Sequence, residues 1–391
     1  MRYASRLERR PADPGEVRGV RETLLQRSGT RINVKQSRGG IMRSMHPLSP
    51  VAISLTIGFL VGVSLSGCAP GEPPAPEYQP EILPLPEQLA TYEEMKIPED
   101  NPMTPEKVAL GRQLFFDKRL SADGSRSCYS CHLCENGLTD GLPTAIGALN
   151  KKLTRSSPTL WNIGYHSEFY WDGRSGSLEK QAMAAWKGGN MGADVEVATA
   201  KINAVPGYQA QFQSVFGGEA TPERIVQAIS AFERTIISGN TPFDRWRAGD
   251  ETAVSDEVKK GYEVFKKLEC TNCHDGVLLT DQQYHNVGIG MDAEKPDVGR
   301  FKVTGKEEDT GAFKTPTLRD IAKSGPYFHD GSVATLEEAV DLMIGGGKPN
   351  KYLDRTNLKK RKATDGEKKN LIAFLGSLTN DCQLTEPKLP E

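Results

Sequence analysis

Two short cysteine motifs carry the clearest chemistry in the sequence. Each has the pattern C-x-x-C-H, in which two thiols three residues apart can add to the two vinyl groups of a haem and the following histidine can bind its iron. A disulfide or a zinc site made of two C-x-x-C pairs is the alternative, but zinc does not require a histidine directly after each pair. The motifs therefore predict two covalently bound haem c groups, attached at Cys128, Cys131 and His132 and at Cys270, Cys273 and His274.

The sequence that follows the two motifs is duplicated. Pro158-Thr159-Leu160 recurs as Pro316-Thr317-Leu318, and Asp172-Gly173 recurs as Asp330-Gly331, always 158 residues later. The unbroken offset gives eight identities over the 25 positions 158–182. A repeat of this kind predicts two related structural units, each with one haem.

The duplication predicts that the two irons differ in their sixth ligand. Met343 follows the second copy of the repeat, and the offset of 158 places Ala185 at the matching position of the first copy. A thioether on the iron favours electron transfer, whereas an open position admits a ligand. We therefore expect His274 and Met343 to close the second haem, and the first haem, on His132, to be open. The alternative for Met343 is a core methionine on a helix.

Helical signals dominate the sequence after residue 90. Thr104-Pro105-Glu106 and Thr221-Pro222-Glu223 are typical of an N-cap followed by proline in the first helical turn. A further helix is expected to start at Ser255, and a last one is expected to follow Asp365. No strong alternating pattern indicates a strand. The predicted fold class is mainly α, with two cytochrome c-like haem domains related by internal duplication. These domains are expected at residues 91–247 and 248–391.

The first 90 residues differ in composition from the remainder. Residues 1–67 contain 11 Lys or Arg against 4 Asp or Glu, and they end in an apolar stretch that is followed by Cys68. The stretch is long enough for a membrane anchor, but its ending, Leu65-Ser66-Gly67-Cys68, resembles a bacterial lipobox. We predict a leader and lipoprotein signal peptide at 1–67, acylation of Cys68 and a proline-rich tether at 68–90. The protein would then be a periplasm-facing lipoprotein of the outer membrane.

Charge limits the class of partner. The 391 residues carry a formal net charge of −2, but residues 68–391 hold 38 basic and 47 acidic side chains, a net of −9. An acidic body argues against nucleic-acid binding and indicates partners that are neutral or basic. With 26% charged residues, 39 glycines and 25 prolines, the composition also excludes collagen, low-complexity disorder and a polytopic membrane protein.

Over roughly residues 90–385 the sequence resembles the bacterial di-haem cytochrome c peroxidases and their relatives of the MauG type. The resemblance depends on both haem motifs and on five further segments. These segments are Gly137-Leu138-Thr139-Asp140, Trp171-Asp172-Gly173-Arg174, Phe313-Lys314-Thr315-Pro316-Thr317-Leu318-Arg319, Pro326-Tyr327-Phe328-His329-Asp330-Gly331 and Leu336-Glu337-Glu338-Ala339-Val340.

The resemblance implies roles for individual residues. Electrons from a small cytochrome c or copper protein would reach the second haem, where the family's methionine ligand matches Met343. Trp171 matches a tryptophan between the haems, and Gln181 matches a glutamine of the pocket in which hydrogen peroxide is reduced at the first haem. A homodimer is a further expectation. Three positions match the calcium site between the family's domains, although the first replaces an asparagine: Ser156, Ser324 and Pro326.

Two positions depart from the resemblance. The family's loop histidine, which blocks the first haem, falls on Ala148, and its catalytic glutamate falls on Asn190. An amide cannot accept the proton that must leave peroxide, and general acid–base help is worth about 10²–10⁴ in rate. His166 and Glu168 are the nearest candidates to replace it. His166 could serve as the base, as a sixth ligand or as a structural histidine, and the alternative for Glu168 is a solvated surface charge.

Other polar residues are expected to have structural roles. His329 matches a family histidine near the second haem and should either bond a propionate or order the contact between the domains, and His285 should be structural. Arg174 should pair with a propionate or with a backbone carbonyl. Cys134 and Cys382 are left over from the haem motifs, and in an oxidising compartment they indicate a disulfide, although the sequence does not show that they meet.

These features lead to one expected function and two alternatives. We predict a cytochrome-c peroxidase, an oxidoreductase that reduces hydrogen peroxide to water. Met343 favours this function over that of the MauG branch, which has a tyrosine at this position and oxidises a partner protein. A non-enzymatic electron-transfer or redox-sensing protein is the other alternative, because the catalytic glutamate is missing.

Overall fold

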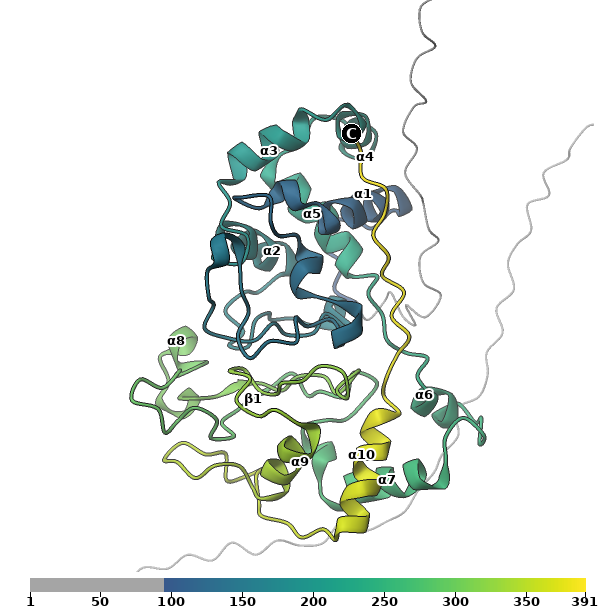
Figure 1. Cartoon of the computed structure of the whole chain (residues 1–391), viewed down its shortest axis with the longest axis vertical. Coiled ribbons are helices and arrows are strands. Elements are labelled where there is room, and N and C mark those ends of the chain that lie inside the picture. The colour runs from purple at the N-terminus through teal and green to yellow at the C-terminus, as the bar shows by residue number, and fades with distance from the viewer. Residues whose placement is uncertain (1–94) are drawn as a thin grey trace, which may run out of the picture. The chain divides into compact units, whose positions relative to one another are not determined.

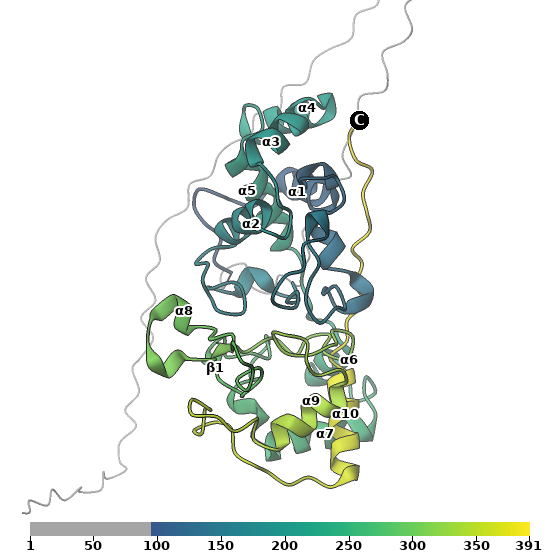
Figure 2. The same cartoon turned by 60° about the vertical axis from the view of Figure 1, so that its left-hand side comes forward.

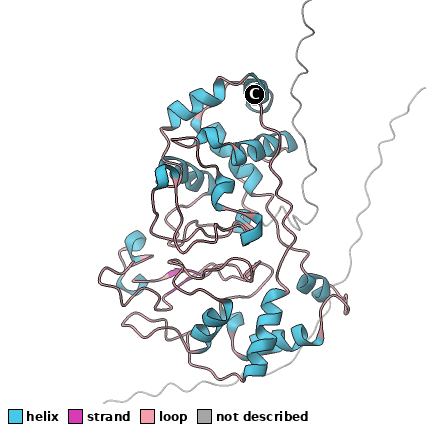
Figure 3. Cartoon of the chain, viewed as in Figure 1, coloured by secondary structure: helices cyan, strands magenta, loops and turns pink. Residues whose placement is uncertain are grey.

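A computed structural model describes residues 95–391, which belong to one compact unit. Helices joined by long irregular segments make up this part of the chain (Figures 1 and 3). The mainly α fold is thereby confirmed. Within residues 95–391, regular strands occur only as a two-stranded antiparallel sheet of β1 (Tyr284–His285) and β2 (Phe313–Lys314).

We call residues 95–239 the first half and residues 240–391 the second half. The α-helices of the first half are α1 (Pro105–Phe116), α2 (Leu178–Lys187), α3 (Val195–Asn203), α4 (Pro206–Phe216) and α5 (Pro222–Glu233). Those of the second half are α6 (Pro242–Arg247), α7 (Asp256–Lys267), α8 (Phe301–Thr304), α9 (Leu336–Ile344) and α10 (Asp365–Gly376). Short 3-10 helices cover Lys118–Leu120, Cys128–Cys131, Cys134–Asn136, Ala148–Asn150, Ile163–Tyr165, Cys270–Asn272 and Glu307–Asp309.

The helices begin where the sequence provides a side-chain cap. Thr104 and Thr221 each accept a hydrogen bond from the backbone N–H of the third residue of the helix that follows, α1 and α5 respectively. Each bond satisfies a donor that has no partner inside the helix. Ser255 caps α7 in the same way, and Thr364 caps α10, which starts at Asp365. All four predicted helices are therefore confirmed.

Each half has its own hydrophobic cluster. In the first half α1 meets α5 at Gly111, where an added Cβ would lie 1.9 Å from the carbonyl oxygen of Ala228. In the second half α7 meets α10 at Gly261, where a Cβ would lie 1.9 Å from the carbonyl oxygen of Asn370. Only glycine permits such a close approach of two helix backbones. Phe243, which precedes the predicted domain boundary at 247/248, packs in the second cluster.

The halves share backbone details at the offset found in the sequence. Phe169 pairs with Ser175 in an isolated β-bridge, and Tyr327 pairs with Val333 in the same way. Both partners of the second bridge lie 158 residues after their counterparts. The residue that follows the first partner of each bridge has a positive φ, 69° at Tyr170 and 70° at Phe328. These correspondences agree with an internal duplication.

The chain returns from the second half to the first half after α10. Residues 377–391 run alongside the first half as far as α4 (Figures 1 and 2), and we call this segment the C-terminal strap. Cys382 forms a disulfide with Cys134, with Cα atoms 5.4 Å apart. Further along, Arg112 donates hydrogen bonds to the carbonyl oxygen and the hydroxyl of Thr385, at 2.9 and 2.7 Å. The two leftover cysteines therefore meet, and the strap ties the halves together.

Three predictions concern residues outside the described part of the chain. These are the leader at 1–67, the acylated Cys68 and the tether at 68–90. Within residues 95–391, no helix combines the length and the apolar character that crossing a bilayer requires.

Candidate active site

The first cysteine motif forms a 3-10 turn followed by a histidine with one free ring nitrogen. The turn is Cys128–Cys131, and Ser127 and Ser130 form a capping box at its start. His132 then donates its Nδ1 hydrogen to the carbonyl oxygen of Leu138, 3.0 Å away. Because a carbonyl can only accept, the ring's lone pair lies on Nε2, which is left to bind iron. Burial lowers the pKa of His132, and this favours the neutral ring.

The second motif repeats this arrangement. After the turn at Cys270–Asn272, His274 donates its Nδ1 hydrogen to the carbonyl oxygen of Leu279, 3.1 Å away. The hydroxyl of Thr317 donates to the carbonyl oxygen of Leu278 at 2.7 Å, and the threonine 158 residues earlier makes the equivalent bond at 2.8 Å. Both histidines are thus oriented by the loop that follows them.

A cavity lies beside each motif, with a volume of about 580 Å³ at the first and about 310 Å³ at the second. We call them the first cavity and the second cavity. Residues around the first cavity include Cys128, Cys131, His132, Gln181, Ala185 and Asn190. Residues around the second cavity include Cys270, Cys273, His274, His285, Met343 and Arg361. Two thiols, an imidazole with a free lone pair and a mainly apolar wall fit a haem c in each cavity.

The two cavities differ in the groups that could occupy the sixth position of an iron. Met343, on α9, lines the second cavity together with His274. The matching position of the first cavity is Ala185 on α2, whose methyl group cannot bind iron. Met191 also lines the first cavity, where it is buried in the first hydrophobic cluster. The linings differ as the repeat predicts, and the role of Met343 as a ligand stays a prediction.

Trp171 contributes to the lining of both cavities. Its indole N–H donates to the carbonyl oxygen of Ser156 at 3.0 Å, and its own carbonyl accepts a hydrogen bond from the backbone N–H of Lys314 at 2.8 Å. The first of these partners belongs to the first half and the second to the second half. Trp171 is therefore fixed by both halves, in the place expected for a relay between two haems.

Gln181 and Asn190 line the first cavity, in agreement with the positions expected for them. The carbonyl oxygen of Gln181 accepts a hydrogen bond from the hydroxyl of Tyr170, 3.2 Å away. Ala148 is buried, and its backbone N–H donates to the carbonyl oxygen of Asn190 at 2.9 Å. An alanine in this loop has no atom that could block an iron.

His166 does not lie at the first cavity. Its ring lines the second cavity, where Nδ1 accepts a hydrogen bond from the ammonium group of Lys314, 2.9 Å away. Burial and the charge of Lys314 hold the pKa of His166 well below its usual value. Its buried Nε2 has no partner among residues 95–391. The predicted roles as base or sixth ligand of the first haem are not supported, because the ring is bound to Lys314 beside the other haem motif.

Two charged residues have partners that differ from the expected ones. Glu168, a second candidate for the base, also lines the second cavity and pairs with Arg300 at 3.0 Å. It does not line the first cavity, and its carboxylate is partly exposed while it pairs with Arg300. Arg174 pairs with the carboxylate of Asp172 at 2.8 Å and lies over the ring of Tyr170, 3.4 Å from its centroid. Arg174 also lines the first cavity, and a propionate partner stays a prediction.

The first cavity offers a carboxyl group that the sequence analysis missed, Glu233 on α5. Glu233 is 5% exposed, and its Oε2 atom has no partner among the described residues. Burial raises the pKa of Glu233 to about 8, a value suited to proton exchange near neutral pH. The signal was present in the sequence, because Glu233 follows Val226 and Ile229 at spacings of seven and four, which place all three on one helix face.

The other carboxylates that line the first cavity are ion-paired. Arg155 bonds Asp172 at 2.8 Å and Asp297 at 2.7 Å. Asp297 belongs to the second half, so this arginine also joins the halves. Since charge-assisted bonds hold both aspartates, Glu233 is the carboxyl group of this lining that keeps a free oxygen.

His329 orders the contact between the halves. Its ring stacks on that of Phe313, with centroids 3.6 Å apart, and its carbonyl oxygen accepts a hydrogen bond from the backbone N–H of Ser156 at 2.8 Å. Burial lowers the pKa of His329 to about 4, so the ring is neutral. The expected contact role is supported, and a propionate partner stays a prediction.

The three residues expected at a calcium ion all line the second cavity, namely Ser156, Ser324 and Pro326. The hydroxyl of Ser156 donates to the carbonyl oxygen of Phe328 at 2.9 Å, and that of Ser324 donates to the carbonyl oxygen of Ile321 at 3.4 Å. Calcium binding stays a prediction.

Comparisons with known proteins agree with this geometry. The sequence model described as "Di-haem cytochrome c peroxidase" matches residues 105–252. The methylamine utilization protein MauG of Methylorubrum extorquens is 36% identical over 360 residues, which cover 89% of this chain and 100% of that protein. The chain belongs to the family of di-haem cytochrome c peroxidases and MauG.

Other members of the di-haem peroxidase family are similarly related. The cytochrome c551 peroxidase of Nitrosomonas europaea is 37% identical over 286 residues, 71% of this chain and 82% of that protein. The crystal structure of a MauG-like protein associated with microbial copper homeostasis aligns with a TM-score of 0.69 and 33% identity, covering 78% of this chain and 96% of the other.

As a member of this family, the protein carries two haem c groups. Bound haem c supplies an iron that exchanges electrons and, where one position is open, binds small oxidants. The residues that fit the two groups are Cys128, Cys131 and His132 in the first half and Cys270, Cys273 and His274 in the second.

Proposed function

We propose that the protein is a cytochrome-c peroxidase, which converts hydrogen peroxide, two electrons and two protons into two waters. The observation that carries the proposal is the difference between the cavities, since Met343 lines the second while Ala185 takes the matching place in the first. A sulfur ligand favours a centre that passes electrons, and a free position favours one that binds an oxidant. The relationship to the cytochrome c551 peroxidase supports the same function.

The chain's own residues divide the work between the two halves. His274 and Met343 would hold the iron of the second cavity, near which a small cytochrome c or copper protein delivers electrons. Trp171 would connect the two cavities, because its conjugated ring lines both and is fixed by hydrogen bonds to both halves. His132 would hold the iron of the first cavity.

Glu233 would accept the proton that leaves peroxide in the first cavity. Asn190 cannot do so, whereas Glu233 combines a free carboxyl oxygen with a pKa that burial raises to about 8. Gln181, which lines the same cavity, would orient the peroxide through its side-chain amide. Proton transfer of this kind contributes about 10²–10⁴ to a rate.

Spectra and turnover test the proposal. The oxidised protein should show one high-spin haem without prior reduction, since Ala148 provides no ligand to block the first haem. It should also consume hydrogen peroxide at steady state with a reduced donor cytochrome. Two low-spin haems that persist after half-reduction would contradict the proposal. An open haem with negligible turnover would instead favour a non-enzymatic electron-transfer or redox-sensing protein.

The similarity to MauG supports a second candidate function, the oxidation of a partner protein by hydrogen peroxide. MauG of Methylorubrum extorquens is matched over its whole length, and the MauG-like structure is 33% identical. Met343 argues against this function, because the MauG branch has a tyrosine at that position. A protein encoded next to this one whose mass changes on reaction with the enzyme and peroxide would establish the second function.

We further propose that the protein is a lipoprotein anchored through acylated Cys68 at the outer membrane and facing the periplasm, that it binds calcium through Ser156, Ser324 and Pro326, and that it forms a homodimer. Mass spectrometry of the mature N-terminal peptide tests the acylation. Metal analysis of the purified protein tests the calcium, and sedimentation velocity tests the dimer.

A further inference from the structure

A strongly basic segment connects α9 to α10 (Figure 1). Residues 345–364, which we call the basic loop, contain seven Lys or Arg side chains and one Asp, so their net formal charge is +6. Residues 68–391 as a whole carry −9. The basic loop is therefore a concentrated positive region on an otherwise acidic protein.

Most of the charges of the basic loop face solvent without a counter-charge. Lys351 pairs with Glu307 at 2.6 Å, and Arg361 pairs with Glu269 at 2.6 Å. Lys359 lies near enough to Glu269 to lower its pKa, after the larger effect of Arg361. Five side chains of the basic loop are exposed and form no ion pair with any residue of 95–391: Lys348, Arg355, Lys359, Lys360 and Lys362.

The basic loop is part of the wall of the second cavity. Asn357, Leu358 and Arg361 line this cavity together with His274 and Met343. Backbone hydrogen bonds hold both ends of the loop. The N–H of Lys348 donates to the carbonyl oxygen of Val287 at 3.0 Å, and the N–H of Arg361 donates to the carbonyl oxygen of Ile344 at 2.8 Å. Lys359, Lys360 and Lys362 are therefore chain neighbours of residues that line the cavity at which electrons are proposed to arrive.

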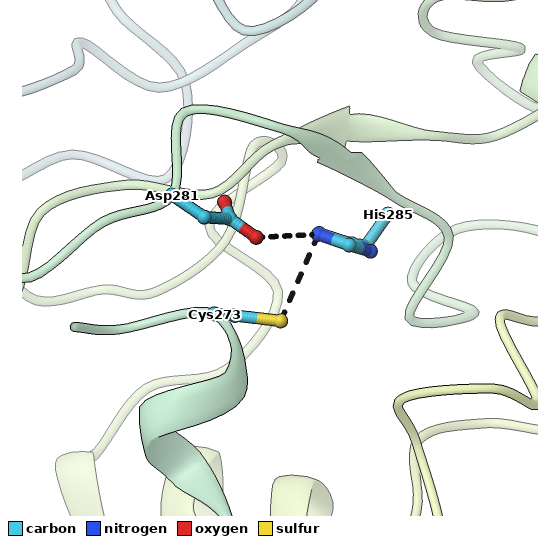
Figure 4. Close-up of side chains that lie close together, drawn as sticks. All are labelled: Cys273, Asp281 and His285. Carbon is cyan, nitrogen blue, oxygen red and sulfur yellow. Dashed lines mark hydrogen bonds and ion pairs between the residues drawn. The ribbon is translucent and has the colours of Figure 1, made fainter. Parts of the chain in front are cut away.

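A side-chain cluster beside the second haem motif fastens the middle of the loop through Asp354. Figure 4 shows the other three members of the cluster, Cys273, Asp281 and His285. The ring of His285 lies between two carboxylates, with Nδ1 2.6 Å from Asp354 of the basic loop and Nε2 3.0 Å from Asp281. Cys273 lies 3.7 Å from the same Nε2. Cys273, Asp281 and His285 lie close enough together to hold a metal ion, but the sulfur of Cys273 is needed for the thioether bond to haem. The cluster is instead a fastening, and it occupies the one carboxylate of the basic loop.

We propose that the basic loop is the docking surface for an acidic electron-donor protein, a small cytochrome or copper protein with negative charge around its redox centre. This inference rests on the proposed function, in which electrons arrive at the second cavity. Opposite charges on two proteins steer their encounter and raise association rates by 10–10³-fold, an effect that salt screens. The local charge thus reverses the expectation of a neutral or basic partner, which was drawn from the net charge alone.

The test compares two triple variants of the holoprotein that change the net charge equally. Lys359→Glu, Lys360→Glu and Lys362→Glu alter the basic loop, and the control replaces three exposed lysines of the first half, Lys96, Lys118 and Lys201, by Glu. The probe is a reduced acidic copper protein of the plastocyanin type, and a basic mitochondrial-type cytochrome c is the comparison donor. Both kcat/KM with each donor and the affinity for the oxidised copper protein are measured from low to high ionic strength.

We expect the loop variant to lose about 10–10³-fold in kcat/KM with the acidic donor at low salt, to lose affinity for the oxidised copper protein, and to approach the unmodified protein at high salt. The control variant should change by less than about twofold. Equal losses in both variants, or none in the loop variant, would overturn the proposal. Binding of the unmodified protein to vesicles of anionic phospholipid, with no binding to the copper protein, would overturn it in favour of a membrane contact.

Peroxide turnover with a small uncharged dye as electron donor tests the peroxidase function separately from the docking role of the basic loop. This reaction needs no docked protein, so it should be the same in both variants and in the unmodified chain. Absent dye turnover in the unmodified protein would contradict the peroxidase function, while the affinity for the oxidised copper protein would still decide the role of the basic loop.

Discussion

The two cavities share one scaffold and differ in the side chain that a matching helix contributes to their lining. In both halves a C-x-x-C turn is followed by a histidine whose Nδ1 is bound to a backbone carbonyl, at 3.0 and 3.1 Å. The helix that faces the first cavity presents Ala185, and its counterpart in the second half presents Met343. The histidine and its backbone partner have thus been kept in both copies of the repeat, and the residue contributed by the matching helix has changed.

The surroundings of the cavities differ in charge as well. The first cavity holds the buried carboxyl group of Glu233 and the ion pairs of Arg155. The second cavity has the basic loop as part of its wall. The two copies of a duplicated haem scaffold can therefore differ in function through single side chains and one loop. The helix pairs that support the copies, α1 with α5 and α7 with α10, need not change.

The largest expected effect comes from removing the sulfur of the second cavity. Met343→Ala should lower the potential of the second haem, since axial ligands span about 0.8 V of haem potentials. A fall of about 0.2 V would make electron acceptance roughly 10³-fold less favourable, because 59 mV corresponds to tenfold for one electron. Spectroelectrochemical titration measures both haems. Met191→Leu, in the first cavity, is the control and should leave the potential of the second haem unchanged. A lowered potential of the second haem in the control, with none in Met343→Ala, would show that Met343 does not bind the iron.

Glu233→Gln tests the chemistry assigned to the first cavity. The variant should lose about 10²–10⁴-fold in kcat/KM for peroxide, with an unchanged second-haem potential. Because only the ionised carboxylate accepts a proton and burial raises the pKa of Glu233 to about 8, the rate of the unmodified protein should rise with pH and level off above about 8. Glu223→Gln, exposed on the same helix, should keep the full rate. A Glu233→Gln variant with the original pH profile would show that another group takes the proton.

The disulfide of the C-terminal strap is expected to stabilise the folded chain by linking its two halves. Changing Cys134 and Cys382 together to serine should cost about 2–5 kcal/mol of unfolding free energy, because the bond closes a long loop of the unfolded chain. Denaturant unfolding followed by circular dichroism measures the loss. A reductant should destabilise the unmodified protein by a similar amount and leave the double variant unaffected; if the reductant also destabilises the double variant, the loss of unfolding free energy does not come from the Cys134–Cys382 bond.

The smallest expected effects concern the two helix pairs. Gly111→Ala and Gly261→Ala should each cost about 1–3 kcal/mol, because a Cβ would force the paired helices apart. Thermal unfolding of the two variants compares them directly. Gly366→Ala on α10, where no atom lies near the added Cβ, should be neutral or slightly stabilising. Losses that differ by more than about 1 kcal/mol would show that the halves do not pack equivalently.

The sequence predicted the fold because its strongest signals are local. The cap at Thr104, the proline after Thr221 and the repeat at an offset of 158 depend on neighbours in the chain or on identity between two segments. The positions of Met343 and Ala185 followed from the same offset. Such signals need no knowledge of which distant residues meet.

The sequence analysis misplaced His166 and Glu168, because both have their partners in the other half of the chain. His166 was placed at the first haem because it precedes Trp171 by five residues, but Lys314, 148 residues later, binds it beside the second motif. The partner of Glu168 is likewise distant, at Arg300. Glu233 could have been found from helix periodicity, whereas the meeting of Cys134 with Cys382 depends on a tail that crosses from one half to the other.

The bond between Cys134 and Cys382 also places a demand on the maturation of the protein. Cys134 follows Cys131 by three residues but must wait for a partner made 248 residues later. During that interval three neighbouring thiols are available, two of which have to stay reduced until they join the porphyrin. An early oxidant would pair Cys134 with one of them and leave the iron without its covalent hold. Cys128 and Cys131 must therefore stay reduced until the haem is attached, and Cys134 must stay available for Cys382.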